Sequence, residues 1–359
     1  MTSRERILAA IDHAPVDRIP VGFEAHDGIA RQLMKHYGVD DRLSLFRAMG
    51  IDGFSVFFES FVGVPYIGPP APTLADGTTC DFWGIDFHQR HLPMAGVQSL
   101  ADLAKYPFPS ADRFDYSGVK AQCRRVKQLG LPTVGGEGGC GIQHLINLRG
   151  YEQALVDPLA DPDLTHAYME RLGDFFVEWN ERWLAAAEGE FDIFRCGDEI
   201  GANDRTHCAP EVWREFYKPQ LRRIFAVAKR HGLKIWFHCC GCCRPLLEDL
   251  IEIGVDLWDP VPGYVAGNDQ PELKRVYGKR LAFIGGVDTL GVLRRGGPRD
   301  VRDEVRRCLD IFAAGGGYIL GGSQGLLDDV PLANAVALFE AAVELGGRAE
   351  YRFGGPLMA

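Results

Sequence analysis

Eight apolar runs rich in β-branched and aromatic residues recur along the chain, and segments with helical periodicity separate most of them. Repeated strand and helix units predict a parallel sheet of the α/β class, and eight such units can close into a (β/α)8 TIM barrel. The predicted strands are residues 18–24, 52–58, 131–137, 191–196, 233–238, 255–259, 280–286 and 317–320. The pattern therefore predicts that residues 1–359 form one barrel domain.

Helix ends are also visible in the sequence. Thr2 and Glu5 have the spacing of a capping box, which predicts an N-terminal helix ahead of the first strand. Asp161 followed by Pro162 predicts the start of another helix, whose apolar stripe we assign to the core.

One connection is much longer than the usual loop of a barrel. Residues 59–130 separate the second predicted strand from the third. Within this insertion, residues 81–87 indicate a short edge strand or hairpin, and residues 116–129 indicate a helix. Because the insertion leaves the second strand at its C-terminal end, we expect it to cover the mouth of the barrel.

The composition is that of an ordinary globular protein, with 46% hydrophobic and 25% charged residues. The net charge is -10 and no block of Lys or Arg is present, which argues against nucleic acid or an anionic membrane as a partner. No apolar signal or membrane-spanning segment is found, so we expect a cytoplasmic protein. The ten cysteines do not have the spacing of a disulfide framework, which favours metal or thiol chemistry in a reducing compartment.

Four of these cysteines follow one histidine directly after an apolar strand, in the order His238, Cys239, Cys240, Gly241, Cys242, Cys243. Side chains alternate along a strand, so His238 and Cys240 should point the same way and Cys239 the other way. Imidazole and thiolate are donors that zinc prefers. The spacing predicts a metal site at His238 and Cys240, whereas the other three cysteines are more typical of packing or accessory thiols.

Polar residues gather at the predicted C-terminal ends of the strands, where barrels of this kind form their active sites. We predict catalytic roles for Asp198, Glu199 and Glu137, and substrate contacts for Glu24, His26, Phe58, Asp288 and Gln324. Any single carboxylate at such a position is more often a helix cap. Aromatic residues accompany them and include Phe57, Trp83, Phe87 and Trp258. Ordinary packing explains most of these rings, although a flat apolar ligand would also find walls there.

The chain resembles the uroporphyrinogen decarboxylase superfamily over nearly its whole length. The resemblance is carried by residues 237–241 (FHCCG), 285–289 (GGVDT), 316–320 (GGYIL) and 329–331 (DVP). The His-x-Cys-Gly element is similar to that of zinc-dependent methyltransferases linked to a corrinoid. The resemblance implies zinc, a cobalamin-type corrinoid carried by a partner protein, and methyl transfer to or from a small molecule such as an aryl methyl ether or a thiol.

Two departures from the family pattern matter. The Arg-rich N-terminal motif with which true decarboxylases hold porphyrinogen carboxylates is missing, and Arg31 is the only nearby arginine after the first strand. The third metal ligand of the related methyltransferases corresponds to Gln324, whose amide is a poor ligand for zinc. Either a carboxylate completes the site, or the metal is weakly held or absent. The candidate carboxylates are Glu24, Glu137, Asp198 and Glu199.

The leading hypothesis is therefore a metal-assisted, corrinoid-dependent methyltransferase, which could form a homodimer. The alternative enzyme is a metal-independent decarboxylase or lyase that acts on a small carboxylic acid through the acidic residues and His26. A metal- or redox-responsive binding protein is a third reading, which no recognisable partner-binding module supports.

Overall fold

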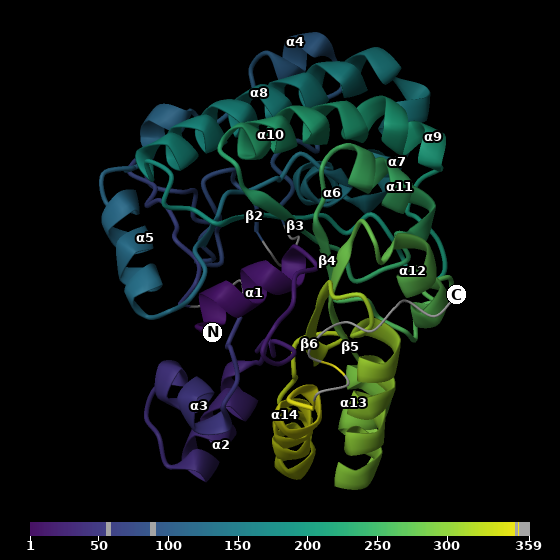
Figure 1. The fold of residues 1–359 in the computed structure, drawn as a ribbon. Helices are drawn as coiled ribbons and strands as arrows, with labels where there is room; N and C mark the ends of the chain where they lie inside the picture. Colours follow the sequence, from purple (N-terminus) through teal and green to yellow (C-terminus); the bar gives the residue numbers. More distant parts are fainter. Residues whose placement is uncertain (55–58, 87–90, 349–350, 352–359) are drawn as a thin grey trace.

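The computed structural model describes residues 1–54, 59–86, 91–348 and 351 of the chain. Parallel strands form one sheet in the order in which they occur along the chain (Figure 1). They are β1 (Val134–Gly135), β2 (Ile193–Gly197), β3 (Lys234–His238), β4 (Leu257–Asp259), β5 (Ala282–Val287) and β6 (Tyr318–Gly322). Their positions confirm the strands predicted from residue 131 onward.

Isolated parallel bridges join the two edges of this sheet and close the barrel. The bridges are Val21 with Leu320 of β6, Gly22 with Phe54, and Phe61 with Val134 of β1. The (β/α)8 prediction is therefore confirmed, although the described residues of the first two predicted strands contribute bridges instead of regular strands.

Local chemistry explains why the first predicted strand makes no ladder. Pro20 has no N–H group to donate. The next N–H group, that of Val21, donates to the side chain of Asp52 at 2.9 Å. Of the second predicted strand only residues 52–54 are described, and residues 55–58, which include Phe57 and Phe58, lie outside the described residues.

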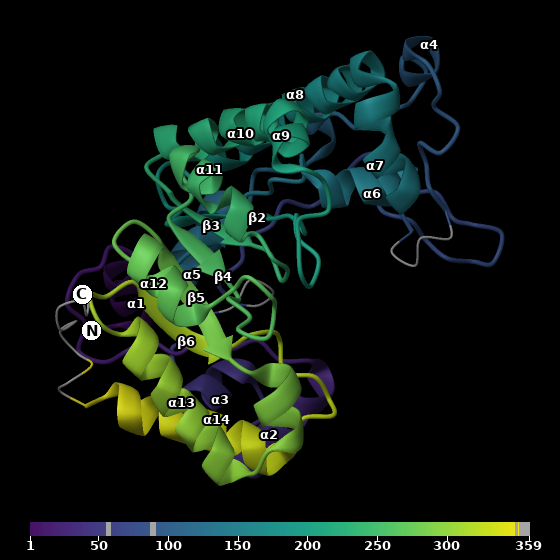
Figure 2. The same ribbon diagram turned by 90° about the vertical axis from the view of Figure 1, so that its right-hand side faces the viewer.

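Helices surround the barrel and alternate with its strands. The α-helices are α1 (Ser3–Ile11), α2 (Asp27–Tyr37), α3 (Arg42–Met49), α4 (Leu100–Leu103), α5 (Val119–Gln128), α6 (Ile142–Arg149), α7 (Tyr151–Ala160), α8 (Pro162–Ala186), α9 (Pro210–Val212), α10 (Lys218–Arg230), α11 (Leu247–Glu252), α12 (Gln270–Tyr277), α13 (Pro298–Phe312) and α14 (Leu332–Gly346). Short π-helical turns are η2 (Trp213–Tyr217) and η4 (Thr289–Leu293), and 3-10 turns are η1 (Ala111–Arg113) and η3 (Arg244–Leu246). Figure 2 shows α8 and α10 side by side at one end of the molecule and α13 and α14 at the opposite end.

Helix α1 lies across the N-terminal ends of the strands, at the closed end of the barrel. Its capping box of Thr2 and Glu5 is confirmed. The Arg4 N–H group donates to the carbonyl oxygen of Gly130, just ahead of β1, at 2.7 Å, and Asp12 pairs with Lys234 at the start of β3. Figure 1 shows α1 in front of the sheet, and Figure 2 shows it on the side away from the arrowheads of β5 and β6. The mouth, at the C-terminal ends of the strands, therefore lies behind the sheet as seen in Figure 1.

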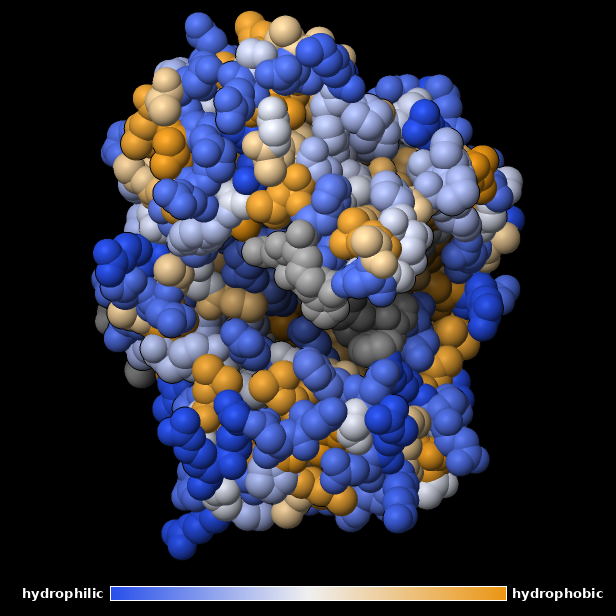
Figure 3. Space-filling view, turned by 180° about the vertical axis from the view of Figure 1, so that it is seen from behind, coloured by the Kyte–Doolittle hydropathy of each residue, from blue (hydrophilic) through white to orange (hydrophobic). Residues whose placement is uncertain are grey.

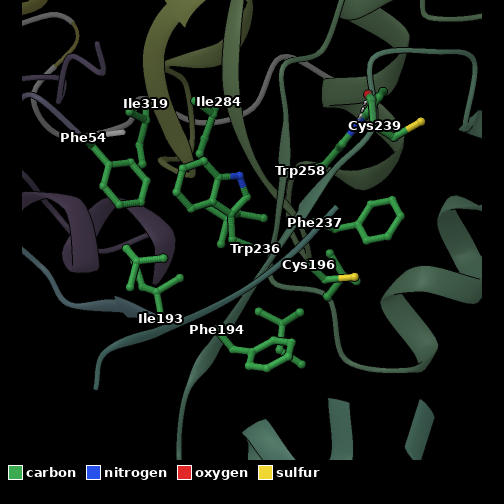
Figure 4. Packing of buried hydrophobic residues seen from close by; sticks show 14 of the residues in the cluster. Phe54, Ile193, Phe194, Cys196, Trp236, Phe237, Cys239, Trp258, Ile284 and Ile319 are labelled. Atoms are coloured by element: carbon green, nitrogen blue, oxygen red, sulfur yellow. Dashed lines mark hydrogen bonds between the residues drawn. The ribbon is translucent and has the colours of Figure 1, made fainter. Parts of the chain in front are cut away.

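The barrel interior and the layer between sheet and helices are both apolar, as the strand alternation predicts. Trp236 of β3 points inward, where its ring stacks on Phe54 with centroids 4.6 Å apart, and Ile284 and Ile319 lie beside it (Figure 4). Phe237 points to the other face of β3 (Figure 4). These apolar side chains fill much of the interior below the mouth.

The insertion after the second strand packs on helices that follow β1. Arg149 of α6 donates hydrogen bonds of 2.7 Å to the carbonyl oxygens of Met94 and Val97. The predicted helix at 116–129 is confirmed as α5, but the predicted hairpin at 81–87 is wrong for the described residues 81–86. There the Asp81 carboxylate accepts the N–H groups of Trp83 and Ile85 and forms a turn, and Phe87 lies outside the described residues.

All ten cysteines are free thiols. Among the described residues, no helix combines the length and the apolar character that crossing a bilayer requires.

Candidate metal centre and barrel mouth

The mouth of the barrel is a hollow on the side opposite α1. Figure 3 views the molecule from behind relative to Figure 1, and its middle is recessed beside the grey atoms. His238 is the last residue of β3, and Cys240 follows two positions later. Their side chains converge, with 3.2 Å between Nε2 of His238 and Sγ of Cys240. Cys239, between them, is fully buried on the other face of the strand end (Figure 4).

Glu199 completes a cluster with these two residues. It lies two residues beyond the end of β2, the strand that pairs with β3 through Gly197 and His238. Its Oε1 atom is 3.4 Å from Nε2 of His238, and its Oε2 atom accepts the Cys240 N–H group at 2.9 Å. The three possible ligand atoms all lie within 4.8 Å of one another.

This donor set fits a zinc ion. Zinc bonds of about 2.0–2.1 Å to nitrogen and 2.3 Å to sulfur place tetrahedral ligand atoms roughly 3.5 Å apart. The separations of 3.2 Å and 3.4 Å around Nε2 of His238 are close to that value. One nitrogen, one sulfur and one oxygen donor leave a fourth position for substrate or water, as catalytic zinc sites do.

Asp259 orients the imidazole from the neighbouring strand. Its Oδ2 atom lies 2.9 Å from Nδ1 of His238, and its other oxygen accepts the indole N–H of Trp236. A carboxylate on Nδ1 directs Nε2 toward the cluster, which is the usual support for a metal-binding histidine. Burial lowers the pKa of His238, but the charge and hydrogen bond of Asp259 outweigh it and the pKa is raised.

Asp198 lies next to Glu199 in sequence but points elsewhere. Its carboxylate accepts the N–H groups of Ile142 at 3.2 Å and Gln143 at 2.9 Å, at the start of α6. Burial raises the pKa of Asp198 to about 7. The structure therefore gives this side chain a capping role, and its catalytic role stays a prediction.

Glu137 follows β1 and is held from both sides. Its N–H group donates to Asn180 of α8 at 3.0 Å, and its Oε1 accepts the N–H group of Gly138 at 3.1 Å. Burial raises the pKa of Glu137, which favours its protonated form. Burial also raises the pKa of Glu24, which lies near enough to His238 and Asp259 to interact with both.

The other predicted substrate contacts are spread around the mouth. His26 is exposed at the N-cap of α2 without a capping hydrogen bond from its side chain. The Asp288 carboxylate accepts the N–H group of Gly291 and caps η4. Gln324 is fixed through its backbone, whose N–H group donates to Oγ1 of Thr289 at 3.2 Å. None of the three belongs to the metal cluster, and Phe58 lies outside the described residues.

Sequence reasoning did not select Arg195. This residue lies in β2 between two buried residues, and its positive charge opposes the rise in pKa that burial causes at both Glu24 and Glu137. Arg195 therefore interacts electrostatically with Glu24, which lies near the metal cluster, and with Glu137 at the end of β1. A charged residue in the middle of an otherwise apolar strand was the signal that could have identified it.

Curated relatives match between about half and nearly all of this chain. It is 27% identical over 200 residues to the methylated-thiol–coenzyme M methyltransferase of Methanosarcina mazei, a match that spans 55% of this chain and only 49% of that protein. It is 22% identical over 357 residues to the methylcobamide:CoM methyltransferase MtaA of Methanosarcina barkeri, across 96% and 98% of the two chains. A uroporphyrinogen decarboxylase of Methylococcus capsulatus is 23% identical over 257 residues, across 69% and 70%.

A solved structure shares the fold. A methyltransferase from Methanosarcina mazei superposes with a TM-score of 0.61 at 19% identity and covers 96% of this chain and 99% of its own. The model of the family described as uroporphyrinogen decarboxylase (URO-D) matches residues 84–345, which include β1 to β6 and all three cluster residues. This chain therefore belongs to the uroporphyrinogen decarboxylase family.

Proposed function

We propose that this protein is a methyltransferase that moves a methyl group between a corrinoid on a partner protein and a small substrate with a methyl group on oxygen or sulfur. The cluster of Glu199, His238 and Cys240 at the mouth of the barrel carries the proposal. Two relatives named as methyltransferases support it, one of them over nearly the full length of both chains.

Glu199, His238 and Cys240 would hold the metal ion, with Asp259 fixing the imidazole of His238. A zinc ion in this position supplies a Lewis acid that stabilises negative charge on an oxygen or sulfur atom. A carboxylate in place of a second thiolate leaves more positive charge on the ion, which suits an oxygen better than a soft sulfur.

Acidic residues of this chain would supply the proton that the leaving group needs. When the bond between the methyl carbon and the oxygen or sulfur breaks, the leaving atom keeps the electron pair and needs a proton. Burial raises the pKa of Glu137 and so favours its protonated form, and Arg195 interacts with its charged form. We assign Glu137 the role of proton donor, and Asp198 the role of positioning α6 beside it.

We further propose that the insertion at 59–130 covers one side of the mouth within a single barrel domain. The barrel pairing continues to Val62, whose N–H group donates to the carbonyl oxygen of Val134 at 2.8 Å, so the insertion leaves the barrel slightly later than residue 59. Its packing on α6 leaves the Glu199 side of the mouth for the corrinoid protein to approach.

The decarboxylase alternative has less support. The decarboxylase relatives match about 70% of the chain, against 96% for the second methyltransferase. Arg31, the one arginine close after the end of the first predicted strand, is exposed on α2.

The test uses the full-length protein and free cobalamin. Elemental analysis should find about one zinc per chain. Reduced cobalamin with a methyl ether such as 2-methoxyphenol should yield methylcobalamin, which is followed by its absorbance. His238→Ala and Cys240→Ser should lose both the zinc and the turnover, whereas Cys243→Ser, a buried cysteine outside the cluster, should keep both. Full turnover by metal-free protein, or carbon dioxide release without cobalamin, would contradict the proposal.

A further inference from the structure

The connection that follows β4 lies against both segments that supply the metal cluster. It covers residues 260–269 and leads into α12. The N–H group of Ala266 donates to the carbonyl oxygen of Asn203, in the segment that follows the cluster glutamate, at 3.0 Å. The side-chain amide of Asn268 donates to the carbonyl oxygen of Gly241, next to the cluster cysteine, at 3.3 Å. These two contacts hold the connection beside the cluster.

Tyr264 is the residue of this connection that brings a further polar group to the cluster. It is 38% exposed. Burial raises the pKa of its hydroxyl, and the hydrogen-bonding side chains of Gln324 and Ser323 oppose that rise. The charge of Cys240 raises the pKa further, so the hydroxyl lies near enough to the cluster cysteine to interact with it. Tyr264 therefore interacts both with the cluster and with the segment that follows β6.

The groups around this hydroxyl determine where its own hydrogen is directed. Ser323 is fully buried, and its Oγ atom accepts the N–H group of Thr289 at 3.1 Å, which leaves the hydrogen of the Ser323 hydroxyl to donate. The side-chain amide of Gln324 carries two more donor hydrogens. Both side chains can thus donate to the oxygen of Tyr264, whereas no described residue accepts its hydrogen. That hydrogen is available to a ligand.

Tyr264 and Glu199 reach the cluster from different strands. Glu199 follows β2, the other two cluster residues lie at the end of β3, and Tyr264 follows β4. Strands β2 and β4 pair with opposite edges of β3. Three protein ligands leave one position of a tetrahedral zinc site open. Because Glu199 occupies the β2 side, a ligand that approaches from the β4 side would meet the hydroxyl of Tyr264.

We propose that the Tyr264 hydroxyl donates a hydrogen bond to a substrate oxygen at the open side of the metal cluster, and that Gln324 and Ser323 position this hydroxyl. The inference rests on the proposed methyl transfer and adds a residue that selects the atom from which the methyl group leaves. A hydroxyl bonds strongly to an oxygen that carries negative charge, whereas sulfur is a weak acceptor. Tyr264 therefore favours methyl groups on oxygen over methyl groups on sulfur.

Ligand binding tests the inference without a corrinoid or turnover. Phenol and thiophenol, which differ in the atom that reaches the metal, are titrated into the zinc-loaded full-length protein by calorimetry. We expect Tyr264→Phe to weaken the binding of phenol about tenfold and that of thiophenol less than about twofold, the effect of one hydrogen bond to a charged oxygen. The variant keeps the ring of a partly exposed residue, so it should fold and retain its zinc.

Two further variants complete the test. Tyr151→Phe is the matched control, because Tyr151 is 51% exposed and its hydroxyl oxygen lies 3.0 Å from Nδ1 of His207, so it should change neither affinity. Gln324→Met removes one donor to the Tyr264 oxygen but leaves Ser323 in place. It should weaken phenol less than Tyr264→Phe does and leave thiophenol unchanged. Packing alone would not distinguish oxygen from sulfur in this way.

Three results would overturn the inference. They are an unchanged affinity for phenol in Tyr264→Phe, an equal loss of phenol and thiophenol in that variant, and an equal effect of Tyr151→Phe. Selective loss of phenol binding in Tyr264→Phe, without any methyl transfer to cobalamin by the unaltered protein, would refute the proposed function and leave the role of Tyr264 intact. Normal methyl transfer together with unaltered phenol binding in Tyr264→Phe would do the reverse.

Discussion

The Nδ1 atom of His238 lies 2.9 Å from Oδ2 of Asp259, and the two residues are partners in the register of β3 and β4. The strand pairing itself thus brings the carboxylate to the imidazole. Asp259 is almost fully buried, and the indole of Trp236 occupies its second oxygen. The carboxylate has little freedom to turn away, so the orientation of His238 is built into the sheet.

We predict that Asp259→Asn weakens zinc binding by about 10–100-fold, the usual cost of losing the carboxylate behind a metal-binding histidine. Zinc affinity is measured by competition with a chromophoric chelator. Asp288→Asn is the control, since Asp288 also follows a barrel strand but caps η4. Unchanged zinc affinity in Asp259→Asn would show that the contact does not support a metal ligand.

Glu199, and not Gln324, should supply the third protein ligand. We predict that Glu199→Gln lowers the zinc content well below one per chain, because a neutral amide is a poor zinc ligand. Gln324→Ala should leave the zinc content unchanged, since Gln324 is held through its backbone and is not part of the cluster. Elemental analysis of both dialysed proteins decides between them, and the opposite pattern would assign the third ligand to Gln324.

A buried ion cluster at the closed end of the barrel should be essential for stability. The Asp52 side chain is fully buried and accepts hydrogen bonds from Arg6 at 2.5 Å and Arg18 at 2.6 Å. Asp52→Asn leaves these arginines without their buried counter-charge, so we expect a loss of about 3–5 kcal/mol in the free energy of unfolding. Urea denaturation measures it.

Asp17→Asn is the comparison for that variant. Asp17 also pairs with Arg6, but its side chain is 43% exposed. Exposed pairs contribute about 0–1 kcal/mol, so Asp17→Asn should cost much less than Asp52→Asn. Similar losses in the free energy of unfolding of the two variants would show that the burial of Asp52 does not explain its contribution to stability.

Lys274 should make stability rise with pH in the alkaline range. It is 2% exposed, and burial lowers its pKa from 10.5 to about 8. Between those values the folded state has released the proton and the unfolded state still holds it, so stability increases with pH. The full shift corresponds to about 3 kcal/mol. Well below pH 8 Lys274 is protonated in both the folded and the unfolded state, so it adds no pH dependence to the stability there.

The measurement compares urea denaturation at pH 7.5 and pH 10. Lys274→Met removes the titrating group, so the gain between the two pH values should be about 2–3 kcal/mol smaller than in the unaltered protein. Lys279→Met, on an exposed lysine nearby in sequence, should keep the gain. The same pH dependence in Lys274→Met would exclude Lys274 as its source.

Strand alternation was enough to predict part of the site. His238 and Cys240 are two positions apart at a strand end, so a local rule places them on one face whatever the rest of the fold does. The same alternation does not show which carboxylates at the other strand ends join the cluster. Glu199 and Asp198 are adjacent in sequence, yet one joins the cluster and the other caps α6.

The sequence by itself determined the order of strands and helices, the barrel class and the pair His238 and Cys240, because each follows from periodicity within one segment. Only the tertiary structure decided the partners of that pair. Glu199 and Asp259 reach His238 through the register of β2 and β4 on either side of β3. The cavity lined by Trp83, His144 and Phe176 likewise exists only where the insertion packs against α6 and α8. Contacts between distant segments depend on how those segments pack together, which no local pattern records.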